Sequence, residues 1–369
     1  MRILILGCGG FIGSHLIGRL TQSSEYEITG IDVSEYKIEE HLSRFEFSRR
    51  DIYADMERLE HEITASDTVV FLASICNPSQ YVTDPAETIR SNFIRPSRIA
   101  ELCAKLGKRL VSISTCEVYG RTISSFIGDD YADPAYYLQN EQTTPSVLGP
   151  IHATRWSYAS AKQLLDRYID SLTVEGLNYT IIRPYNFFGA RMDYIPDAWN
   201  SGVPRVLASF MNAMFKGEPI KLVNGGKAYR TITYIDDAIN AIVKILERPV
   251  QARNQLFNIA NPANELTVEQ LAHKMRSIYA DLTGDESFRN HPVVSIPGSE
   301  FYGAGYEDCD RRVPDISKAR ELLDWEPKVS LDETLTKAVR FFVNFERKRG
   351  NAPLPLKSGA DSQESLSSP

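Results

Sequence analysis

The sequence predicts an α/β fold in which a doubly wound parallel sheet is combined with a smaller, discontinuous C-terminal domain. Short apolar segments alternate with amphipathic segments through the first half of the chain, and such alternation gives parallel strands joined by right-handed crossover helices. A glycine-rich run directly follows the first apolar segment, where a strand would turn into a helix. From about residue 187 the alternation weakens, which indicates the second domain.

The expected elements follow the apolar pattern in chain order. Sheet strands are expected at residues 2–6, 27–32, 44–47, 68–72, 109–114 and 179–183. Helical periodicity predicts helices at residues 11–20, 96–106, 206–215, 232–247, 266–282 and 330–345. We also expect a short strand at 221–223 and a long ordered loop at 191–203.

The turn after the first strand has the glycine spacing of a dinucleotide-binding site. A G-x-x-G-x-x-G motif begins at Gly7, so backbone can approach a pyrophosphate while the next helix presents its free amides. Asp32 ends the second strand, where a carboxylate accepts from a ribose 2′-hydroxyl and repels a 2′-phosphate, which favours NAD over NADP. The alternative is a tight strand–helix turn without a ligand. The expected cofactor contacts in this unit are Gly7, Gly10, Phe11, Ile12, Gly13 and Asp32.

Composition limits the class of protein. The formal net charge is −7 with 24% charged residues and no basic block, so neither nucleic acid nor an anionic membrane is an expected partner. We find no apolar run of about 18 residues and expect no membrane span. The five cysteines lack metal-ligand spacing, so we expect reduced thiols and no metal. Met1 and Arg2 lead directly into a strand, so we expect no signal peptide and a cytoplasmic protein.

A second motif predicts redox chemistry on a hydroxyl group. Tyr158 and Lys162 lie one helical turn apart, and an ammonium beside a phenol lowers the phenol pKa so that it can act as a base. Ser114 and Thr115 end the strand expected beside this helix, and a hydroxyl there can bind the same substrate oxygen. The Y-x-x-x-K spacing alone is common on ordinary helices. Behind a complete dinucleotide motif it favours removal of a hydroxyl proton with hydride transfer to NAD.

These motifs resemble the extended short-chain dehydrogenase/reductase family, whose members rework nucleotide sugars. The resemblance covers the chain to about residue 345, and Thr115, Tyr158 and Lys162 match the family's catalytic trio. It implies a Rossmann-type fold and a homodimer formed through a four-helix bundle built from residues 96–106 and the helix of Tyr158. Tyr158 and Lys162 are also implied to contact NAD.

The resemblance also divides the chain. It implies an NAD-binding domain at residues 1–186, to which 232–260 return, and a mainly UDP-sugar-binding domain at 187–345. Residues 350–369 are rich in Ser, Pro and Gly and lack periodicity, and we expect a disordered tail there.

Finer motifs are similar to the UDP-glucuronate decarboxylase branch of this family. They lie at residues 155–158, 183–186 and 307–314. After the catalytic threonine, the family's dehydratases carry Asp-Glu and its decarboxylases Ser-Glu, whereas this chain has Cys116 and Glu117. Other segments are closer to a ring-contracting subgroup in which two cysteines face the sugar, matching Cys76 and Cys116; these are 75–81, 114–122, 191–196, 202–208 and 300–303. The loop at 196–201 looks shortened, which affects fine substrate contacts more than the reaction class.

The resemblance implies oxidation of UDP-glucuronate at C4, decarboxylation, and retro-aldol and aldol steps that give UDP-apiose, with UDP-xylose as co-product. It implies that Arg312 and Glu117 manage decarboxylation and that Tyr158 cycles its proton. Cys116 and Glu117 are expected to form a proton relay, because small shifts from free pKa values of about 8.5 and about 4.3 bring either group near neutrality. One alternative is a plain UDP-glucuronate decarboxylase without ring contraction. Another is a non-catalytic NAD-binding sensor.

Several of these residues also have a purely structural explanation. Cys116 and Cys76 could be small core residues, and Arg312 could form a surface salt bridge, with Arg311 as the competing choice. Arg230 could lie in a solvated turn. On the cofactor side we expect contacts from Asp51, Ile52 and Leu72, although Asp51 could equally be a helix N-cap. The expected substrate-binding residues are Tyr81, Arg155, Asn186, Arg191, Arg205, Lys221, Arg230, Tyr306 and Asp308.

Overall fold

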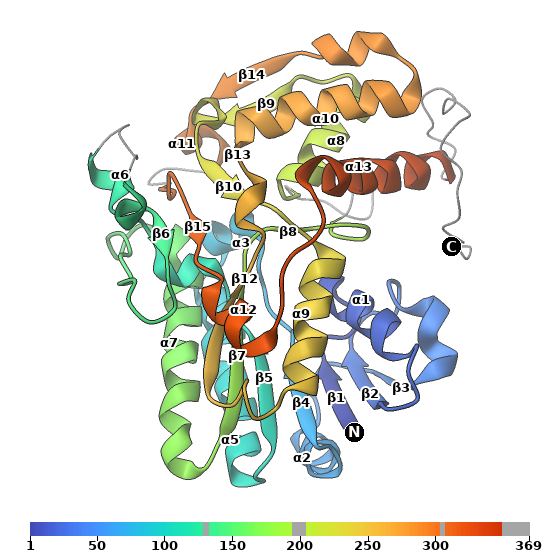
Figure 1. Ribbon diagram of the computed structural model, residues 1–369, viewed down its shortest axis with the longest axis vertical. Coiled ribbons are helices and arrows are strands. Elements are labelled where there is room, and N and C mark those ends of the chain that lie inside the picture. The colour runs from blue at the N-terminus through green and yellow to red at the C-terminus, as the bar shows by residue number, and fades with distance from the viewer. Residues whose placement is uncertain (128–132, 194–203, 303–306, 349–369) are drawn as a thin grey trace.

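The computed structural model describes residues 1–127, 133–193, 204–302 and 307–348 (Figure 1). Seven parallel strands form the central sheet in the order β12-β7-β5-β4-β1-β2-β3, which confirms the predicted doubly wound sheet. Strand β1 lies between β4 and β2, so the strand order reverses between β1 and β4. Their bounds are β1 Arg2–Leu6, β2 Glu27–Asp32, β3 Glu46–Arg49, β4 Thr68–Phe71, β5 Arg109–Ile113, β7 Asn178–Pro184 and β12 Gln255–Ile259.

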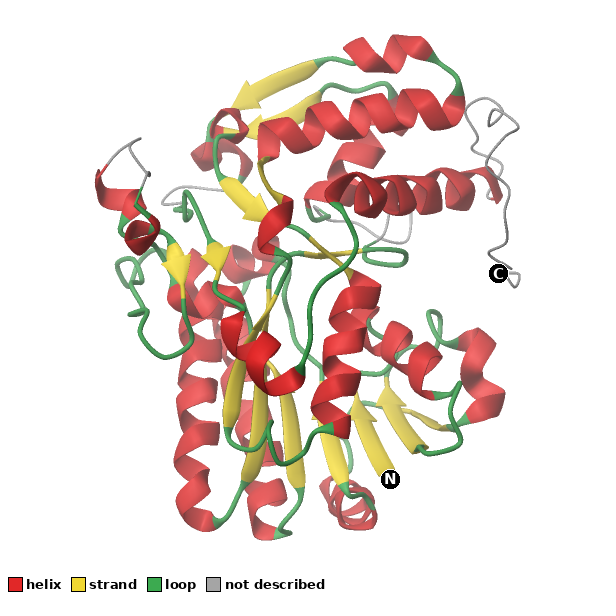
Figure 2. Ribbon diagram, viewed as in Figure 1, coloured by secondary structure: helices red, strands yellow, loops and turns green. Residues whose placement is uncertain are grey.

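Helices cover both faces of the sheet (Figure 2). Ile3 and Ile5 of β1 belong to a core with α1 (Phe11–Leu20) and α9 (Ile235–Glu247). Leu4 and Leu6 point to the opposite core, since side chains alternate along a strand. That second core is formed with α2 (Met56–Ala65), α5 (Arg95–Lys105) and α7 (Ser157–Ser171). A parallel sheet buried on both faces requires such near-continuous apolar strands.

A third core lies beyond the carboxyl ends of the strands, in the upper part of Figure 1. It is built from α8 (Val206–Lys216), α10 (Val268–Thr283) and α13 (Leu331–Lys348). Strands β9 (Ile220–Val223) and β14 (Val293–Ile296) pair in parallel beside it. The division into domains at residues 186 and 345 stays a prediction.

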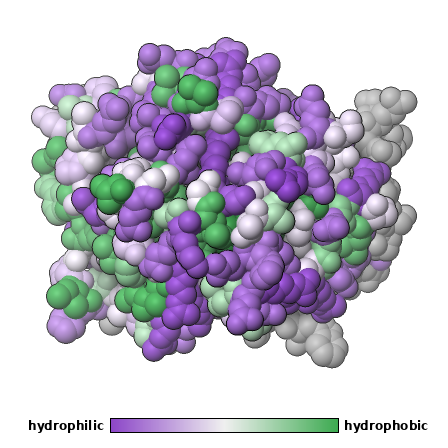
Figure 3. Space-filling model, turned by 90° about the horizontal axis from the view of Figure 1, so that it is seen from below, coloured by the Kyte–Doolittle hydropathy of each residue, from purple (hydrophilic) through white to green (hydrophobic). Residues whose placement is uncertain are grey.

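Smaller elements connect these layers. They are α3 Pro78–Thr83, α4 Pro85–Ile89, a π-helical turn Arg90–Ile94, α6 Ser124–Ile127, β6 Leu138–Gln139, β8 Phe187–Phe188, β10 Tyr229–Thr231, β11 Thr233–Tyr234, β13 Glu265–Thr267, α11 Gly298–Phe301, β15 Val313–Pro314 and α12 Ser317–Leu323. In Figure 3 the face at the amino ends of the strands is mostly hydrophilic, with hydrophobic residues in small groups. None of the helices in the described ranges is both long and apolar enough to cross a membrane.

The expected elements are largely confirmed, with three differences. Strand β3 begins at Glu46 rather than at residue 44, and β12 was not expected; both are edge strands with polar residues, so hydrophobicity marks them weakly. The helix expected from residue 232 begins at Ile235, because Thr233–Tyr234 pair with β8 instead. The tail at 350–369 and most of the loop at 191–203 lie outside the described residues.

Truncating a core side chain of α9 should destabilise the sheet. Ile242 is fully buried between α9 and the strands, so Ile242→Ala is expected to lower the free energy of unfolding by about 2–5 kcal/mol. Urea denaturation measures this change. Val250→Ala is the control, because Val250 is 80% exposed and its truncation should change stability by no more than about 0.5 kcal/mol. Equal effects of the two variants would contradict the packing described.

Candidate active site

The glycine-rich turn after β1 forms a cradle that requires glycine at positions 7 and 13. Gly7 has a φ of +91°, and a Cβ there would lie 2.7 Å from the amide nitrogen of Ala73. A Cβ at Gly13 would lie 2.4 Å from the Gly7 carbonyl oxygen, so α1 could not approach the strand. At Gly10, the N-cap of α1, an added Cβ has room, since the nearest described atom is 3.4 Å away. The turn therefore leaves backbone at the helix N-terminus open to a phosphate group.

Asp32 is fixed beside this turn. Its carboxylate accepts hydrogen bonds from the Gly9 amide at 2.9 Å and from the Ser34 amide at 3.0 Å. The cradle and the carboxylate together fit a dinucleotide whose phosphates face the helix and whose ribose faces β2. The alternative of a helix cap at Asp51 is wrong: its carboxylate accepts from the Tyr53 amide, and Asp55 caps α2. Of the other expected contacts, Ile52 is buried and Leu72 is partly buried at the end of β4.

Tyr158, Lys162 and Thr115 meet at the carboxyl end of β5. The ammonium of Lys162 donates to the carbonyl of Ile113 at 2.9 Å, and Thr115 caps the turn Cys116–Tyr119 by accepting from the Glu117 amide. The ring of Tyr81 is stacked on that of Tyr158, with centroids 4.7 Å apart and an interplanar angle of 3°. The structure thus brings the predicted trio together and places Tyr81 against it.

Burial is the largest influence on the pKa values of Tyr158 and Lys162. It raises the pKa of Tyr158 above its ordinary value, while hydrogen bonds with Thr115 and Ser74 act to lower it. Burial lowers the pKa of Lys162 to about 8, opposed by the carboxylate of Asp166 one helical turn further on. The Lys162 ammonium donates to the carbonyl of Ile113 rather than to the phenol of Tyr158. The expected lowering of the Tyr158 pKa by Lys162 stays a prediction.

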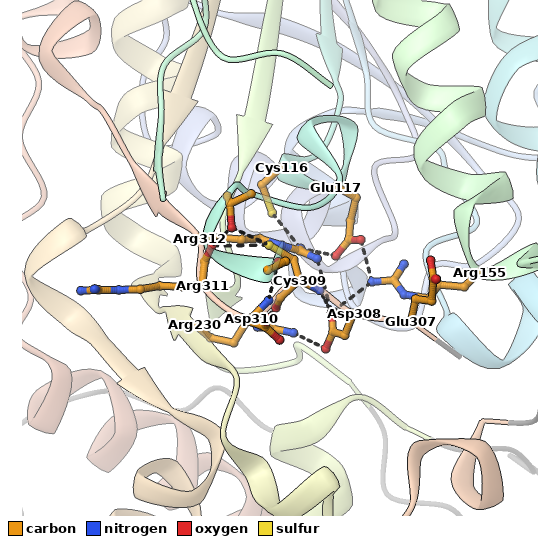
Figure 4. Close-up of polar contacts among 12 residues, drawn as sticks. Cys116, Glu117, Arg155, Arg230, Glu307, Asp308, Cys309, Asp310, Arg311 and Arg312 are labelled. Atoms are coloured by element: carbon orange, nitrogen blue, oxygen red, sulfur yellow. Dashed lines mark hydrogen bonds and ion pairs between the residues drawn. The ribbon is translucent and has the colours of Figure 1, made fainter. Parts of the chain in front are cut away.

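Beside the trio lies a cluster of buried charges, shown in Figure 4. Arg312 pairs with Glu117 and lies 3.4 Å from Asp308. Arg155 donates to Glu117 at 2.7 Å, and Arg230 pairs with Asp308. Three arginines therefore converge on two shared carboxylates, and guanidinium groups suit an anionic group.

The charges of this cluster set the ionisation of Glu117 and Cys116. Burial acts to raise the pKa of Glu117, but Arg155 and Arg312 outweigh it and hold that pKa well below its usual range. Burial raises the pKa of the Cys116 thiol, against the lowering by Arg312, whose Nη1 is 3.8 Å from the sulfur. These directions do not favour the expected proton relay, because neither pKa moves toward neutrality. Glu117 is held as a carboxylate and Cys116 as a thiol.

The neighbouring arginines 311 and 312 face opposite directions, as Figure 4 shows. Arg312 is 3% exposed and enters the charge cluster, so the surface salt-bridge alternative is wrong. Arg311 binds Glu265 on β13 at 2.8 Å and lies 3.8 Å from the ring centroid of Tyr137. The structure favours Arg312 over Arg311 at the site.

The two cysteines singled out from the sequence have different surroundings. Cys116 is buried against Arg312. Cys76 is exposed between β4 and α3, so the core alternative is wrong for it, and its charge would act on Tyr158 and Lys162. Cys8, Cys103 and Cys309 are buried.

Of the expected substrate-binding residues, Arg155, Arg230 and Asp308 lie in the charge cluster. Asn186 and Arg230 line one small pocket whose other lining residues include Phe188, Ile232 and Leu266. Arg205 binds Asp193 and lies near enough to Cys76 and Tyr81 for their charges to affect it.

Two other expected residues are placed elsewhere. Lys221 is exposed on β9, and the contacts of the described residues do not join it to the cluster. Arg191 binds Glu40 and the carbonyl of Lys37, on the cofactor side of the fold. Tyr306 lies outside the described residues.

The sequence reasoning missed two residues behind the trio. Ser74 donates to Asn92 at 2.7 Å and acts on the Tyr158 phenol. Asp166 binds Arg183 of β7 at 3.0 Å and follows Lys162 by four positions. That spacing is readable in the sequence, because residues four apart share a helix face. Ser74 carries no comparable signal.

Fold and site together define the class of protein. Residues 3–260 match the NAD dependent epimerase/dehydratase family, and the chain belongs to it. This confirms the resemblance seen in the motifs and NAD as the cofactor.

Several named relatives are similar to this chain over most of its length. The chain is 42% identical over 372 residues to UDP-D-apiose/UDP-D-xylose synthase 1 of Arabidopsis thaliana, covering 96% of this chain and 95% of the relative. It is 43% identical over 349 residues to UDP-D-apiose/UDP-D-xylose synthase of Oryza sativa subsp. japonica, covering 91% and 87%. The crystal structure of PbgP3 protein from Burkholderia pseudomallei superposes with a TM-score of 0.80 at 31% identity, covering 96% of this chain and 99% of that one.

The thiols should differ sharply in reactivity. Cys76 is exposed, whereas burial raises the pKa of Cys8, Cys103 and Cys116, so one thiol per chain should react rapidly with iodoacetamide. Mass spectrometry of timed samples at pH 7.5 would locate the label. Cys76→Ser should remove the rapid phase, and Cys103→Ser should leave it intact. A rapid phase that survives Cys76→Ser would contradict the described exposure.

Proposed function

We propose that the protein converts UDP-glucuronate to UDP-apiose, with UDP-xylose as co-product, by C4 oxidation, decarboxylation and ring contraction. The observation that carries the proposal is the buried contact of Cys116 with Arg312, beside a Glu117 carboxylate and the Tyr158–Lys162 pair. The identity of 42% with a UDP-D-apiose/UDP-D-xylose synthase over nearly the whole chain supports it.

The first step removes the proton of the C4 hydroxyl and a hydride from C4 itself. The turn at Gly7–Gly13 and Asp32 would hold NAD, which would supply a hydride acceptor for C4 and a hydride donor at the end of the cycle. Tyr158 accepts the hydroxyl proton as the general base, and the hydroxyl of Thr115 binds the same oxygen. Lys162 supplies positive charge beneath the phenol, which favours the phenolate.

Decarboxylation follows because a ketone at C4 makes the C6 carboxylate part of a β-keto acid. The C5–C6 bond breaks, carbon dioxide leaves, and the electron pair passes into an enolate of the C4 ketone. Arg312 and Arg155 supply positive charge for the anionic groups, and their guanidinium groups suit a carboxylate. Glu117 stays ionised and orients both guanidinium groups rather than moving a proton.

Ring contraction then needs a proton donor and acceptor near the 4-keto pentose. Loss of the C2 hydroxyl proton cleaves the C2–C3 bond by a retro-aldol step, and re-closure through C4 gives a branched furanose with an exocyclic aldehyde. Reduction of that aldehyde by the hydride taken from C4 completes UDP-apiose. The thiols of Cys116 and Cys76 are assigned to these proton transfers, with Cys116 starting in its protonated form. Protonation at C5 with return of the hydride to C4 instead gives UDP-xylose.

Further features belong to the same proposal. The enzyme acts as a lyase in the cytoplasm, and a homodimer forms through a bundle of α5 and α7 from each subunit. Two exposed apolar side chains support this face: Leu164 on α7 is 47% exposed, and Ile94 before α5 is 46% exposed.

Product analysis tests the proposal directly. Purified protein with UDP-glucuronate and NAD should yield a branched UDP-furanose, or its cyclic phosphate breakdown product, together with UDP-xylose by ¹H NMR. UDP-xylose alone would support a plain decarboxylase, and no turnover would contradict both. Tyr158→Phe should lower turnover by about 10²–10⁴-fold, because it removes the general base. Tyr136→Phe, at a 38% exposed position, is the matched control and should leave turnover unchanged.

The role of the buried thiol can be separated from decarboxylation. Cys116→Ser should retain carbon dioxide release while lowering the UDP-apiose share about tenfold or more, because a proton-transfer group of the later steps is weakened. The ratio of the two products by NMR is the measurement. Cys103→Ser, in the core of α5, should keep the wild-type ratio. Equal loss of both products would show that Cys116 has no special part in ring contraction.

A further inference from the structure

Two segments 154 positions apart hold each other by an exchange of hydrogen bonds. The ammonium of Lys37 donates to the carbonyl of Arg191 at 2.8 Å, and the guanidinium of Arg191 donates to the carbonyl of Lys37 at 2.9 Å. Glu40 completes the arrangement by pairing with Arg191. We call these three residues the clasp.

A contact between α1 and the residue before Arg191 holds the same segment in place. His15 lies 2.9 Å from the carbonyl of Ala190, and burial lowers its pKa to about 4, so it is neutral at pH 7. Arg191 has a φ of +62°, a left-handed backbone that favours glycine. A glycine at position 191 would relieve the backbone strain but would lose the side chain that binds Glu40 and the Lys37 carbonyl. These contacts explain why an arginine occupies this position.

The clasp borders the place where the dinucleotide fits. Lys37 follows Asp32 by five residues, and His15 belongs to the helix that begins at the glycine turn. The Lys37 ammonium is near enough to Arg205 and Cys76 for their charges to affect it. In Figure 1 the segment after β8 lies above α1, on the carboxyl-end side of the sheet. The clasp therefore joins the cofactor side of the fold to the segment that leads to the substrate side.

We propose that the clasp retains NAD(H) in the protein between uptake and return of the hydride, with Lys37, Glu40 and Arg191 as positioning residues. The inference rests on the proposed function, in which the same dinucleotide must serve both ends of one cycle. Opening of the clasp would separate the segment after β2 from the segment after β8 and free a route for the dinucleotide. Loss of clasp contacts is then expected to accelerate release.

The test measures NADH release without any sugar present. Protein loaded with NADH is mixed with excess NAD in a stopped-flow instrument, and the loss of bound-NADH fluorescence gives the dissociation rate. Lys37→Met and Arg191→Met should each release NADH about tenfold faster, since each removes a charge-assisted hydrogen bond. The double variant should be no faster than about either single variant, because the exchange acts as one unit.

Controls separate retention from general damage to the fold. Arg49→Met removes an exposed arginine that pairs with Glu35 in the same region, and it should keep the wild-type rate. Glu40→Gln is nearly isosteric and leaves the main-chain bonds in place, so it should fold and release NADH severalfold faster. An unchanged rate in folded Glu40→Gln and in the methionine variants would overturn the proposal. Failure of the proposed function would appear instead as absent sugar products in the wild-type protein, whatever the release rate.

Discussion

The reversal of strand order between β1 and β4 is the constraint on which this structure depends. All seven strands run parallel, so their carboxyl ends lie at the same edge of the sheet. Because the strand order reverses between β1 and β4, the connections that follow these two strands lead away from each other and leave space between them. Gly7 lets the chain turn against Ala73 at that point, and the third core, built from α8, α10 and α13, lies beyond the same end. The cradle, the Tyr158 trio and the charge cluster therefore all gather at one edge of the sheet.

Buried charge is the second determinant of the site. Glu117 and Asp308 are each shared by more than one arginine, so neither of these two buried carboxylates is left unpaired. Removing one partner from such a group costs far more than an exposed salt bridge would suggest, because the remaining charge keeps its desolvation penalty. The same pairing fixes the guanidinium groups before any substrate arrives. Positioned charge of this kind contributes most in catalysis when it needs no rearrangement during the reaction.

Sequence patterns predicted the parts of this protein that are local. The glycine turn, Asp32 and the Tyr158–Lys162 spacing are each defined within a few residues of a strand or helix end, so they could be placed without a structure. Ionisation could not be predicted in this way. The pKa of Glu117 is lowered by Arg155 and by Arg312, which is 195 positions away. The resemblance implied that Arg312 and Glu117 act together, but no local pattern predicts the lowered pKa. Arg191 was also expected at the substrate, because its neighbours in the sequence do not reveal that its partners lie in the segment after β2.

The opposed arginines at 311 and 312 make the site sensitive to the register of a very short strand. β15 is only Val313–Pro314, paired in parallel with β6, yet it directly follows the residue that neutralises Glu117. Successive side chains of an extended segment face opposite ways. A slip by one residue would therefore turn Arg312 toward β13 and place Arg311 or Val313 in the charge cluster instead. A slip that brings Val313 into the place of Arg312 would therefore remove a positive charge from the charge cluster, whereas a slip that brings Arg311 there would keep it.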